Sequence, residues 1–308
     1  MKTDSVLEKV LSSGNLVVTS ECGPPRGAAV DKVHKKAEML KGYVDAVNVT
    51  DNQTAMVRMS SFAASVFLRQ MDLHPVLQMV TRDRNRLAMQ ADIIGAYAHG
   101  INTMLCLSGD HPHFGDHPMA ANVHDIDSIQ FIQMVKQMRD EGIFQGGAKI
   151  DTPPKMFIGA AANPFADPFE LRVARLAKKV AAGVDFIQTQ CIYNVDKFEQ
   201  WMEGVCGRGL NEKCAILAGI TPMKSVGMAR YMKNKVPGMD VPQALVDRMG
   251  GVPKEQQAEE GLKICVETIQ RLKEVPGVAG FHIMAIEWEQ KVPEIVEKSG
   301  LYPRPKPN

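Results

Sequence analysis

The first apolar segment of the chain leads into a carboxylate and a proline-rich turn, in the run Leu16-Val17-Val18-Thr19-Ser20-Glu21-Cys22-Gly23-Pro24-Pro25-Arg26. Proline cannot donate to a sheet and restricts the residue before it, so a strand formed here has to end near Gly23. This places Glu21 at the carboxyl end of a first strand. In a parallel α/β barrel that end faces the active site, and a Glu that only caps a turn is the alternative interpretation.

Short apolar runs recur along the chain, at residues 16–20, 46–50, 76–80, 102–107, 156–161, 186–190, 215–220 and 278–286. Stretches with helical periodicity lie between them, at residues 31–40, 54–70, 84–98, 127–139, 168–182, 195–205, 225–233 and 255–273. This alternation predicts the α/β class, as a single (β/α)8 TIM barrel over residues 1–308. A doubly wound sheet is the alternative, although no G-x-G-x-x-G follows the first strand.

Turn chemistry predicts several boundaries within this pattern. Asp31 is expected to cap the helix that it begins. Glycines typical of helix C-termini occur at Gly100, Gly142, Gly183 and Gly277. Loops are predicted at residues 145–154 and 236–253, and residues 302–308 form a Pro/Lys-rich segment that is expected to be a flexible tail.

Composition excludes several functional classes. The chain has 308 residues and a net charge of +1, so no basic excess indicates a nucleic-acid partner. No apolar run is long enough for a membrane span, and the N-terminus does not resemble a signal peptide. Six cysteines without a C-x-x-C pair indicate a reducing cytoplasmic compartment and no metal cluster of the chain's own.

The ends of the predicted strands carry many hydrogen-bonding groups and few cations. They contribute Glu21, Thr50, Asp51, Asn52, Gln78, Ser108, Gly109, Asp110, His111, Asn163, Thr189, Gln190, Thr221, Glu287 and Trp288. Such a set suits a planar polar heterocycle better than a phosphate cluster. Glu21 and Asp110 could divide the roles of proton donor and anion, while the Gln190 amide offers both a donor and an acceptor.

Two further features have competing interpretations. A loop rich in histidine, with His111, His113, His117 and His124, is more typical of a solvated segment than of a metal site. The small-residue run at 159–164 would let a bulky cofactor approach the backbone, or would serve tight helix–sheet packing.

Several motifs occur in order over nearly the whole chain: SECGPPR at 20–26, VNVTD at 47–51, LSGD at 107–110, AANP at 161–164, KKVAAG at 178–183, FIQTQ at 186–190 and GITP at 219–222. Together they resemble the flavin-dependent methylenetetrahydrofolate reductases. The resemblance implies a (β/α)8 barrel with FAD at the carboxyl ends of the strands. It also implies an enzyme of one-carbon metabolism, in methionine biosynthesis or acetogenesis.

The resemblance implies a role for each matching residue. Glu21 would be the general acid that protonates 5,10-methylenetetrahydrofolate towards N10 and opens its five-membered ring. Asp110 would stabilise the resulting 5-iminium cation, Gln190 would bind the pterin, and Thr221 would contact the substrate. Hydride transfer from N5 of the reduced flavin would then give 5-methyltetrahydrofolate.

The resemblance also implies a set of FAD contacts, at Thr50, Gln78, Gly109, Asp110, His124, Ala161, Asn163, Asp167 and Lys179. Gln78 stands where the family often has His, and His124 where an aromatic residue often covers the flavin. Lys179 would reach a phosphate or ribose as a mobile cation, whereas a solvated helix face is the alternative.

Met228 and Met232 replace a Gln and a Phe that support NADH in some bacterial relatives. Losing an aromatic face removes a stacking platform, so direct oxidation of NADH is doubtful. An acetogen-like catalytic subunit that receives electrons from a partner with zinc or iron–sulfur centres is the resulting hypothesis, within an oligomer. The 19 Met residues could provide an interface for this partner, although core packing is the favoured interpretation for most of them.

Two other functions remain open at this point. A folate-binding barrel methyltransferase subunit would use similar polar strand ends but would contain no flavin. A flavin-bearing or scaffold subunit would leave catalysis to another chain.

Overall fold

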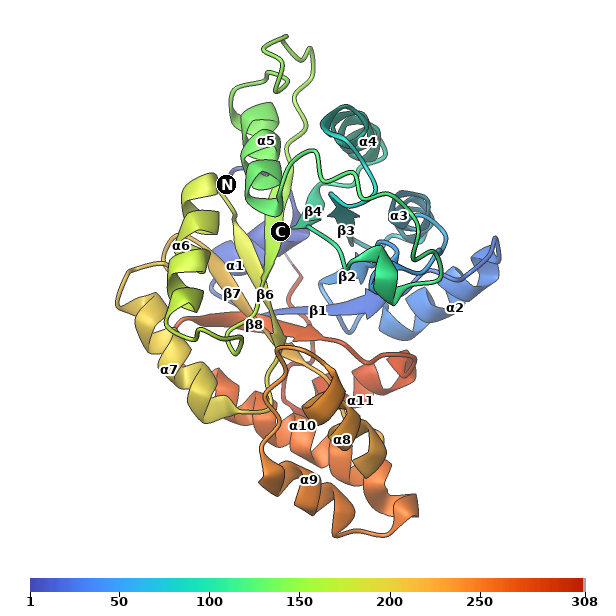
Figure 1. Ribbon diagram of the computed structural model, residues 1–308, viewed down its shortest axis with the longest axis vertical. Coiled ribbons are helices and arrows are strands. Elements are labelled where there is room, and N and C mark those ends of the chain that lie inside the picture. Colours follow the sequence, from blue (N-terminus) through green and yellow to red (C-terminus); the bar gives the residue numbers. More distant parts are fainter. Residues whose placement is uncertain (307–308) are drawn as a thin grey trace.

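The computed structural model describes residues 1–306 and contains a closed parallel barrel in which each strand pairs with the next and β8 returns to β1. Figure 1 shows the strands surrounded by helices. The strands are β1 (Val17–Cys22), β2 (Ala46–Val49), β3 (Pro75–Val80), β4 (Thr103–Leu107), β5 (Phe157–Ala162), β6 (Phe186–Cys191), β7 (Ala215–Ile220) and β8 (Val278–Ile283). The predicted (β/α)8 barrel is confirmed, and the doubly wound sheet is not formed.

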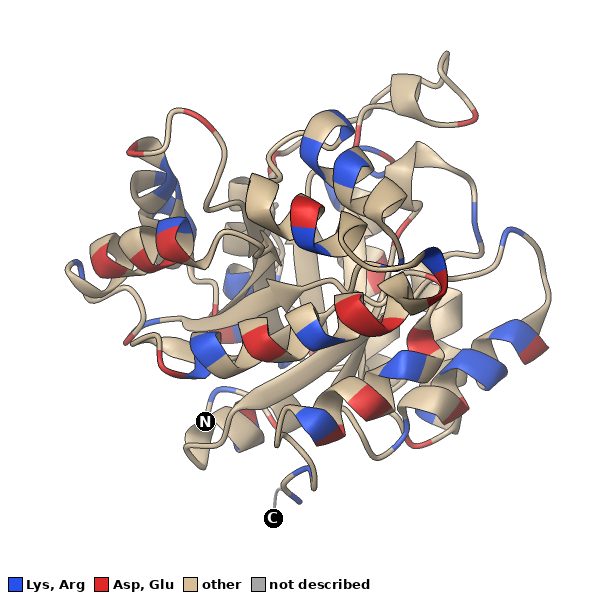
Figure 2. Ribbon diagram, turned by 90° about the horizontal axis from the view of Figure 1, so that it is seen from below, with Lys and Arg blue, Asp and Glu red and all other residues tan. Residues whose placement is uncertain are grey.

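The helices alternate with the strands, except that α1 precedes β1 and that α8, α9 and α10 all lie between β7 and β8. They are α1 (Val6–Ser12), α2 (Val30–Leu40), α3 (Ser61–Gln70), α4 (Arg86–Ala98), α5 (Ser128–Asp140), α6 (Leu171–Ala182), α7 (Val195–Cys206), α8 (Val226–Lys235), α9 (Gln243–Gly250), α10 (Gln257–Lys273) and α11 (Val292–Lys298). Figure 1 shows α8, α9 and α10 together at one end of the molecule. Figure 2 shows Lys and Arg interspersed with Asp and Glu along the outer helices, as expected from a net charge of +1.

The barrel interior is apolar at its amino end and polar above it. Inward residues of the strands, among them Val17, Leu105 and Leu217, form one cluster with Leu7 and Val10 of α1, which closes this end. Phe157 and Phe186 stack there with their ring centroids 5.3 Å apart. A Cβ at Gly159 would lie 2.3 Å from the Phe186 ring, so only glycine leaves room for it.

Strand alternation then places polar side chains one layer higher. Because successive side chains in a strand point to opposite sides, the second residue after Val17 is again inside the barrel, and so is the fourth. These are Thr19 and Glu21, and Glu21 pairs in register with Asn48 of β2. The register between β1 and β8 brings His282 beside Thr19. The strand ends therefore converge on one site.

Two helix predictions are wrong at their amino ends. Asp31 lies inside the first turn of α2 and not at its cap, which is Ala29. The helix predicted at 54–70 begins only at Ser61, because the hydroxyl of Ser60 caps it by accepting from the Ala63 N–H (3.2 Å). Before that point the backbone of Thr54 has a φ of 57°, which no right-handed helix contains.

The predicted loop at 236–253 is also wrong, because it contains α9. The helix buries Val246 and Met249 against α8 and α10. Pro242 and the Gly250–Gly251 pair suggested a loop, yet they lie at the two ends of the helix. The last strand is shorter than predicted and ends at Ile283. The loop predicted at 145–154 is confirmed, and all four helix-terminal glycines have positive φ.

Part of the expected tail is tied to the barrel. Tyr302 stacks on Tyr43 with ring centroids 5.2 Å apart, and Arg304 pairs with the buried carboxylate of Asp45 at 2.6 Å. Arg304 also donates to the carbonyl of Leu16 (2.6 Å). The flexible tail stays a prediction for the residues beyond this anchor, and 307–308 lie outside the described residues. Among residues 1–306 no helix has the length and hydropathy needed to cross a bilayer.

Candidate functional site

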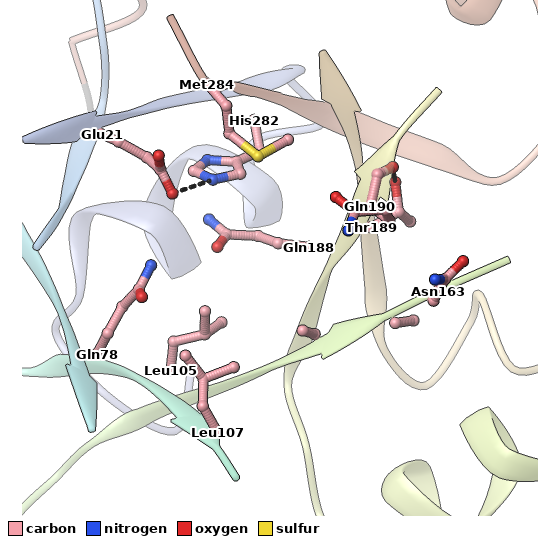
Figure 3. A pocket seen from close by; sticks show the side chains of 12 residues that line it. Glu21, Gln78, Leu105, Leu107, Asn163, Gln188, Thr189, Gln190, His282 and Met284 are labelled. Atoms are coloured by element: carbon pink, nitrogen blue, oxygen red, sulfur yellow. Dashed lines mark hydrogen bonds and ion pairs between the residues drawn. The ribbon is translucent and has the colours of Figure 1, made fainter. Parts of the chain in front are cut away.

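A cavity of about 360 Å³ opens at the carboxyl ends of the strands. Its walls come from six of the strands and the residues just after them, through Glu21, Gln78, Leu105, Leu107, Ala161, Ala162, Asn163, Gln188, Thr189, Gln190, His282 and Met284. Figure 3 shows Glu21, Gln78 and Gln188 pointing into a common space, with Gln190 and Asn163 on the other side. The sequence-predicted residues Glu21, Gln78, Ala161, Asn163 and Gln190 are therefore brought together.

A second cavity of about 240 Å³ adjoins the first one. It is lined by Glu21, Thr50, Asp51, Asn52, Gln53, Gln78, Val80, Arg82, Leu107, Ser108, Gly109 and Asp110. A smaller cavity of about 60 Å³ lies between β1 and the segment after β8, and Glu21 borders this one too. Glu21 is thus the residue at which the three cavities meet.

Glu21 lies beside a histidine from the neighbouring strand. The Nε2 atom of His282 is 3.5 Å from Oε1 of Glu21, and the two side chains are 4% and 17% exposed. Figure 3 marks this contact at one wall of the cavity. A partly buried carboxyl group with an imidazole nitrogen on one side and an open cavity on the other can donate or accept a proton.

Asp110 lies in the turn after β4, where two hydrogen bonds hold it in place. Its Oδ2 accepts from the Thr54 N–H (3.1 Å), while its carbonyl accepts from Nη1 of Arg82 (2.7 Å). The preceding Gly109 has a φ of 88°, and a Cβ there would be 3.0 Å from Val80. Both features favour glycine at the position that directly precedes Asp110.

Thr50 has an unusual environment for a hydroxyl group. The residue is 2% exposed and its Oγ1 atom has no hydrogen-bond partner among the described residues. A buried polar atom without a partner costs free energy comparable to a lost hydrogen bond. Since Thr50 lines the second cavity, its hydroxyl is available to a polar ligand there.

Lys179 reaches from α6 to the end of β5. It is 8% exposed, and its Nζ donates to the carbonyl of Ala161 at 2.5 Å. Burial, followed by the charge of Arg175, lowers the pKa of Lys179 from 10.5 to about 8. The alternative of a solvated helix face is wrong for this residue, because its side chain is packed beneath the site.

Gln190 and Thr221 lie at the ends of β6 and β7, but only Gln190 lines the larger cavity. The Gln190 Oε1 accepts from the Cys191 N–H (3.0 Å), and the residue lines the larger cavity. Thr221 is 4% exposed, and its hydroxyl lies 2.8 Å from the Cys191 thiol. Its carbonyl accepts from the Tyr193 hydroxyl (3.1 Å). Thr221 is therefore committed to protein partners and does not line the cavities described above.

Three of the predicted cofactor contacts do not line these cavities: Lys179, which is buried against β5, and the loop residues His124 and Asp167. His124 is exposed, with its Nδ1 3.3 Å from the hydroxyl of Thr81. Asp167 is exposed in the loop before α6, where its carbonyl accepts from Arg172. Both residues lie on loops at the same end of the barrel as the site.

A sequence profile described as Methylenetetrahydrofolate reductase matches residues 6–300. The chain belongs to the methylenetetrahydrofolate reductase family. It is 24% identical over 322 residues to methylenetetrahydrofolate reductase 2 of Schizosaccharomyces pombe, covering 98% of this chain and 48% of that protein. It is 21% identical over 311 residues to a probable methylenetetrahydrofolate reductase (NADPH) of Caenorhabditis elegans, covering 96% and 44%. The chain spans about half the length of these relatives.

The solved structures contain a similar barrel in an uncharacterized protein from Clostridium thermocellum that binds two copies of 5-methyl-5,6,7,8-tetrahydrofolic acid. The TM-score is 0.63 at 13% identity, covering 96% of this chain and 98% of that chain. At this identity the likeness shows the fold alone. The family resemblance that the motifs predicted is thus confirmed, and the barrel fold has an independent counterpart.

Sequence reasoning missed several polar residues of this reductase-family barrel. His282, Gln188 and Asn48 lie inside it beneath Glu21, and Arg82 supports Asp110. The missing signal was strand alternation. Counting back two residues from Gln190 gives Gln188, and from Thr50 it gives Asn48, because alternate residues face the same side.

The histidine-rich loop provides no metal centre among residues 1–306. His111, His113 and His117 are exposed, as expected for the solvated alternative. Asp116 in this loop accepts from the Val57 N–H (3.2 Å) and pairs with Arg26 (2.5 Å). The loop is thereby attached to the segments that follow β1 and β2.

The methionines are mostly buried or partly buried, as the favoured interpretation of core packing predicts. Of the 19 Met residues only Met1 and Met119 are exposed, so core packing is the correct interpretation for most of them. Met232 is 6% exposed and packs in a cluster with Ala229 and Met249, while Met228 is partly buried beside it. Neither Met offers an aromatic face to a ligand.

Proposed function

We propose that this chain reduces 5,10-methylenetetrahydrofolate to 5-methyltetrahydrofolate with bound FAD. The observation that carries the proposal is the position of Glu21 at the junction of the three cavities, with Gln190 and Asp110 on the walls around it. Membership of the methylenetetrahydrofolate reductase family supports the same activity. The adjoining cavities of about 360 and 240 Å³ would receive the two ring systems that a reductase of this kind has to hold together.

The residues present fit a flavin. The unpartnered Thr50 hydroxyl and the Gln78 amide offer hydrogen-bond partners to a polar ring edge. Ala161 and Ala162, which are small, leave space for a flat ring over β5. Gly109, Asp110, Asn163 and Lys179 would complete the contacts, with His124 and Asp167 reached by the rest of the cofactor. When bound, FAD would supply the hydride that reduces the one-carbon unit.

The chain's own residues would bind the folate and move the proton. Gln190 would hold the pterin through its amide. Glu21 would donate a proton towards N10 and so open the five-membered ring. The Asp110 carboxylate, fixed by the Thr54 N–H and the Arg82 contact, would stabilise the positive charge that develops on the folate. Thr221 would act through Cys191 at the end of β6, since its hydroxyl contacts that residue.

We further propose that electrons reach the flavin from a partner subunit with zinc or iron–sulfur centres and not directly from NADH. The support is the packing of Met232 into the core of α8 and α9, where it provides no stacking platform for a nicotinamide. Anaerobic mixing of the purified chain with NADH tests this. Slow or absent bleaching of the flavin band is expected, and rapid bleaching would contradict the proposal.

The alternative is a folate-binding methyltransferase subunit without flavin. The observation that favours it is the likeness to a barrel that binds 5-methyl-5,6,7,8-tetrahydrofolic acid, which shows that this fold can hold a folate. The absorbance spectrum of the purified chain separates the two functions. A flavin band is expected for the reductase, and a colourless protein that binds folate would support the methyltransferase.

Substitution of Glu21 tests the role of the general acid. In Glu21→Gln we expect the reoxidation of dithionite-reduced flavin by methylenetetrahydrofolate to slow by at least about 100-fold, because general acid catalysis contributes on this scale. Flavin content should be unchanged. Glu38→Gln, an exposed site on α2, is the matched control for loss of one carboxylate. Equal reoxidation rates in Glu21→Gln and the wild type would refute the proposed acid.

A further inference from the structure

A buried chain of polar side chains runs beneath Glu21. Nε2 of His282 faces Glu21 at 3.5 Å, and Nδ1 of His282 lies 2.8 Å from the Thr19 hydroxyl. Thr19 Oγ1 is 3.1 Å from Nε2 of Gln188, whose amide pairs reciprocally with Asn48 at 2.7 and 3.0 Å. Thr19, Asn48, Gln188 and His282 are at most 3% exposed, so their polar atoms need hydrogen-bond partners.

The hydrogen-bond donors and acceptors around His282 determine which of its two ring nitrogens carries the proton. The two Nε2 hydrogens of Gln188 go to Asn48 Oδ1 and Thr19 Oγ1. Thr19 therefore receives one hydrogen bond and has its own hydroxyl hydrogen to donate, and His282 Nδ1 is the acceptor beside it. A neutral imidazole that accepts at Nδ1 has its proton on Nε2. That N–H points towards Oε1 of Glu21.

The opposite direction of the hydrogen bonds along Gln188, Thr19 and His282 is less favourable. Exchanging the oxygen and nitrogen of both amides keeps the pair between Asn48 and Gln188 but makes Thr19 donate to Gln188. His282 would then carry its proton on Nδ1, and its Nε2 lone pair would face the Glu21 oxygen. Two acceptors would meet in a buried setting whenever Glu21 is ionised, which costs free energy.

We propose that His282 is the positioning residue for Glu21, a role that rests on the proposed function of Glu21 as general acid. Its Nε2–H donates to Oε1, so the transferable proton is carried on Oε2, the oxygen left for the substrate. Thr19, Gln188 and Asn48 hold His282 in this tautomer. The separation of 3.5 Å is longer than a normal hydrogen bond. Catalytic hydrogen bonds commonly tighten when substrate binds.

Thr19 provides the cleanest test, because it is 0% exposed and can influence the substrate only through its neighbours. Thr19→Val keeps the shape of the side chain and removes the hydroxyl, whereas Thr19→Ser keeps the hydroxyl. The reoxidation of dithionite-reduced flavin is followed by stopped flow over a range of methylenetetrahydrofolate concentrations. Flavin content and the thermal midpoint are measured for each variant.

We expect Thr19→Val to lower the limiting rate of reoxidation by about tenfold or more, since misplacement of a catalytic group costs rate on this scale. The half-saturating folate concentration should change by less than about twofold, because ground-state binding is unaffected. Thr19→Ser should restore most of the rate. A merely structural role would change stability or flavin content in Thr19→Val without this selective loss of the limiting rate.

Three results would contradict the inference. A wild-type limiting rate in Thr19→Val overturns it, and so does a loss of rate in Thr19→Ser equal to that in Thr19→Val. If Thr19→Val does not fold, the pair His282→Phe and His282→Gln replaces it. Gln retains an N–H donor for Glu21 and Phe does not, so equal rates in this pair overturn the inference. If wild-type reduced flavin is not reoxidised by methylenetetrahydrofolate, the proposed function itself fails.

Discussion

The buried ammonium of Lys179 should make the protein less stable at neutral pH than an uncharged side chain would. Its pKa is about 8 in the folded protein in place of 10.5, chiefly because burial disfavours the charged form. The unfolded chain therefore binds more protons than the folded chain between these two values. The stability contributed by this group is present above pH 10.5 and is lost as pH falls through about 8.

The magnitude follows from these pKa values. At pH 7 the buried charge costs about 3 kcal/mol, and at pH 10 it costs less than about 1 kcal/mol, by proton linkage. In Lys179→Met the cost is removed at every pH. The altered packing and the lost hydrogen bond to Ala161 also change the free energy of unfolding, but by an amount that does not depend on pH. The free energy of unfolding of Lys179→Met relative to wild type should therefore fall by about 2.5 kcal/mol from pH 7 to pH 10.

Urea unfolding of the flavin-free protein at the two pH values measures this difference. Lys178→Met is the matched control, because Lys178 is the exposed neighbour on the same helix and should show no comparable pH dependence. If Lys179 also contacts the cofactor, Lys179→Met should bind FAD more weakly while being more stable at pH 7. That combination would show a charge retained for binding at the expense of stability.

One result would refute the reasoning directly. If the stability difference between Lys179→Met and wild type is the same at pH 7 and pH 10, the buried group does not change its protonation in this range. The interpretation of Lys179 as a desolvated ammonium would then be wrong. An equal pH dependence in Lys178→Met would refute it as well, since the effect could not then come from burial.

Two further substitutions test contacts around the barrel. Gly238→Ala should weaken flavin binding, measured by fluorescence titration, because a Cβ there would lie 2.1 Å from the Asn163 amide and the φ is +76°. Gly146→Ala, which meets nothing within 4 Å, is its control, and equal affinities would contradict the contact. Arg304→Met should lower the free energy of unfolding by about 3 kcal/mol, because it leaves the buried Asp45 carboxylate unpaired. A loss below about 1 kcal/mol in urea would mean that Arg304 does not anchor this segment.

The strand–helix alternation could be predicted from local sequence, because it depends on periodicity and on proline and glycine at the boundaries. Glu21 could be placed at a strand end for the same reason. Segments in which the apolar residues have no clear periodicity were harder to assign to helix or loop. The helix at α9 was missed because its flanking Pro242 and Gly250 suggested a loop. The start of α3 was misplaced because the positive φ at Thr54 leaves no trace in composition.

The site was predicted in part. Residues at or near the carboxyl ends of strands, such as Gln190 and Asp110, were found because any parallel barrel gathers strand ends. Thr221 was expected to contact a ligand, but its hydroxyl contacts Cys191. His282 was missed because its relevance depends on the neighbouring strand, and Thr19, its hydrogen-bond partner, is 263 positions away in sequence.

The sequence by itself determined the barrel, the family and the strand-end position of Glu21, because these depend on local periodicity and ordered motifs. Only the tertiary structure decided which polar residues meet inside the barrel. Closing β8 against β1 sets the register that brings His282 to Thr19 and Glu21. The packing of α6 against β5 buries Lys179, which lowers its pKa. Desolvation and hydrogen-bond partnership arise from packing between distant segments, and no local pattern contains them.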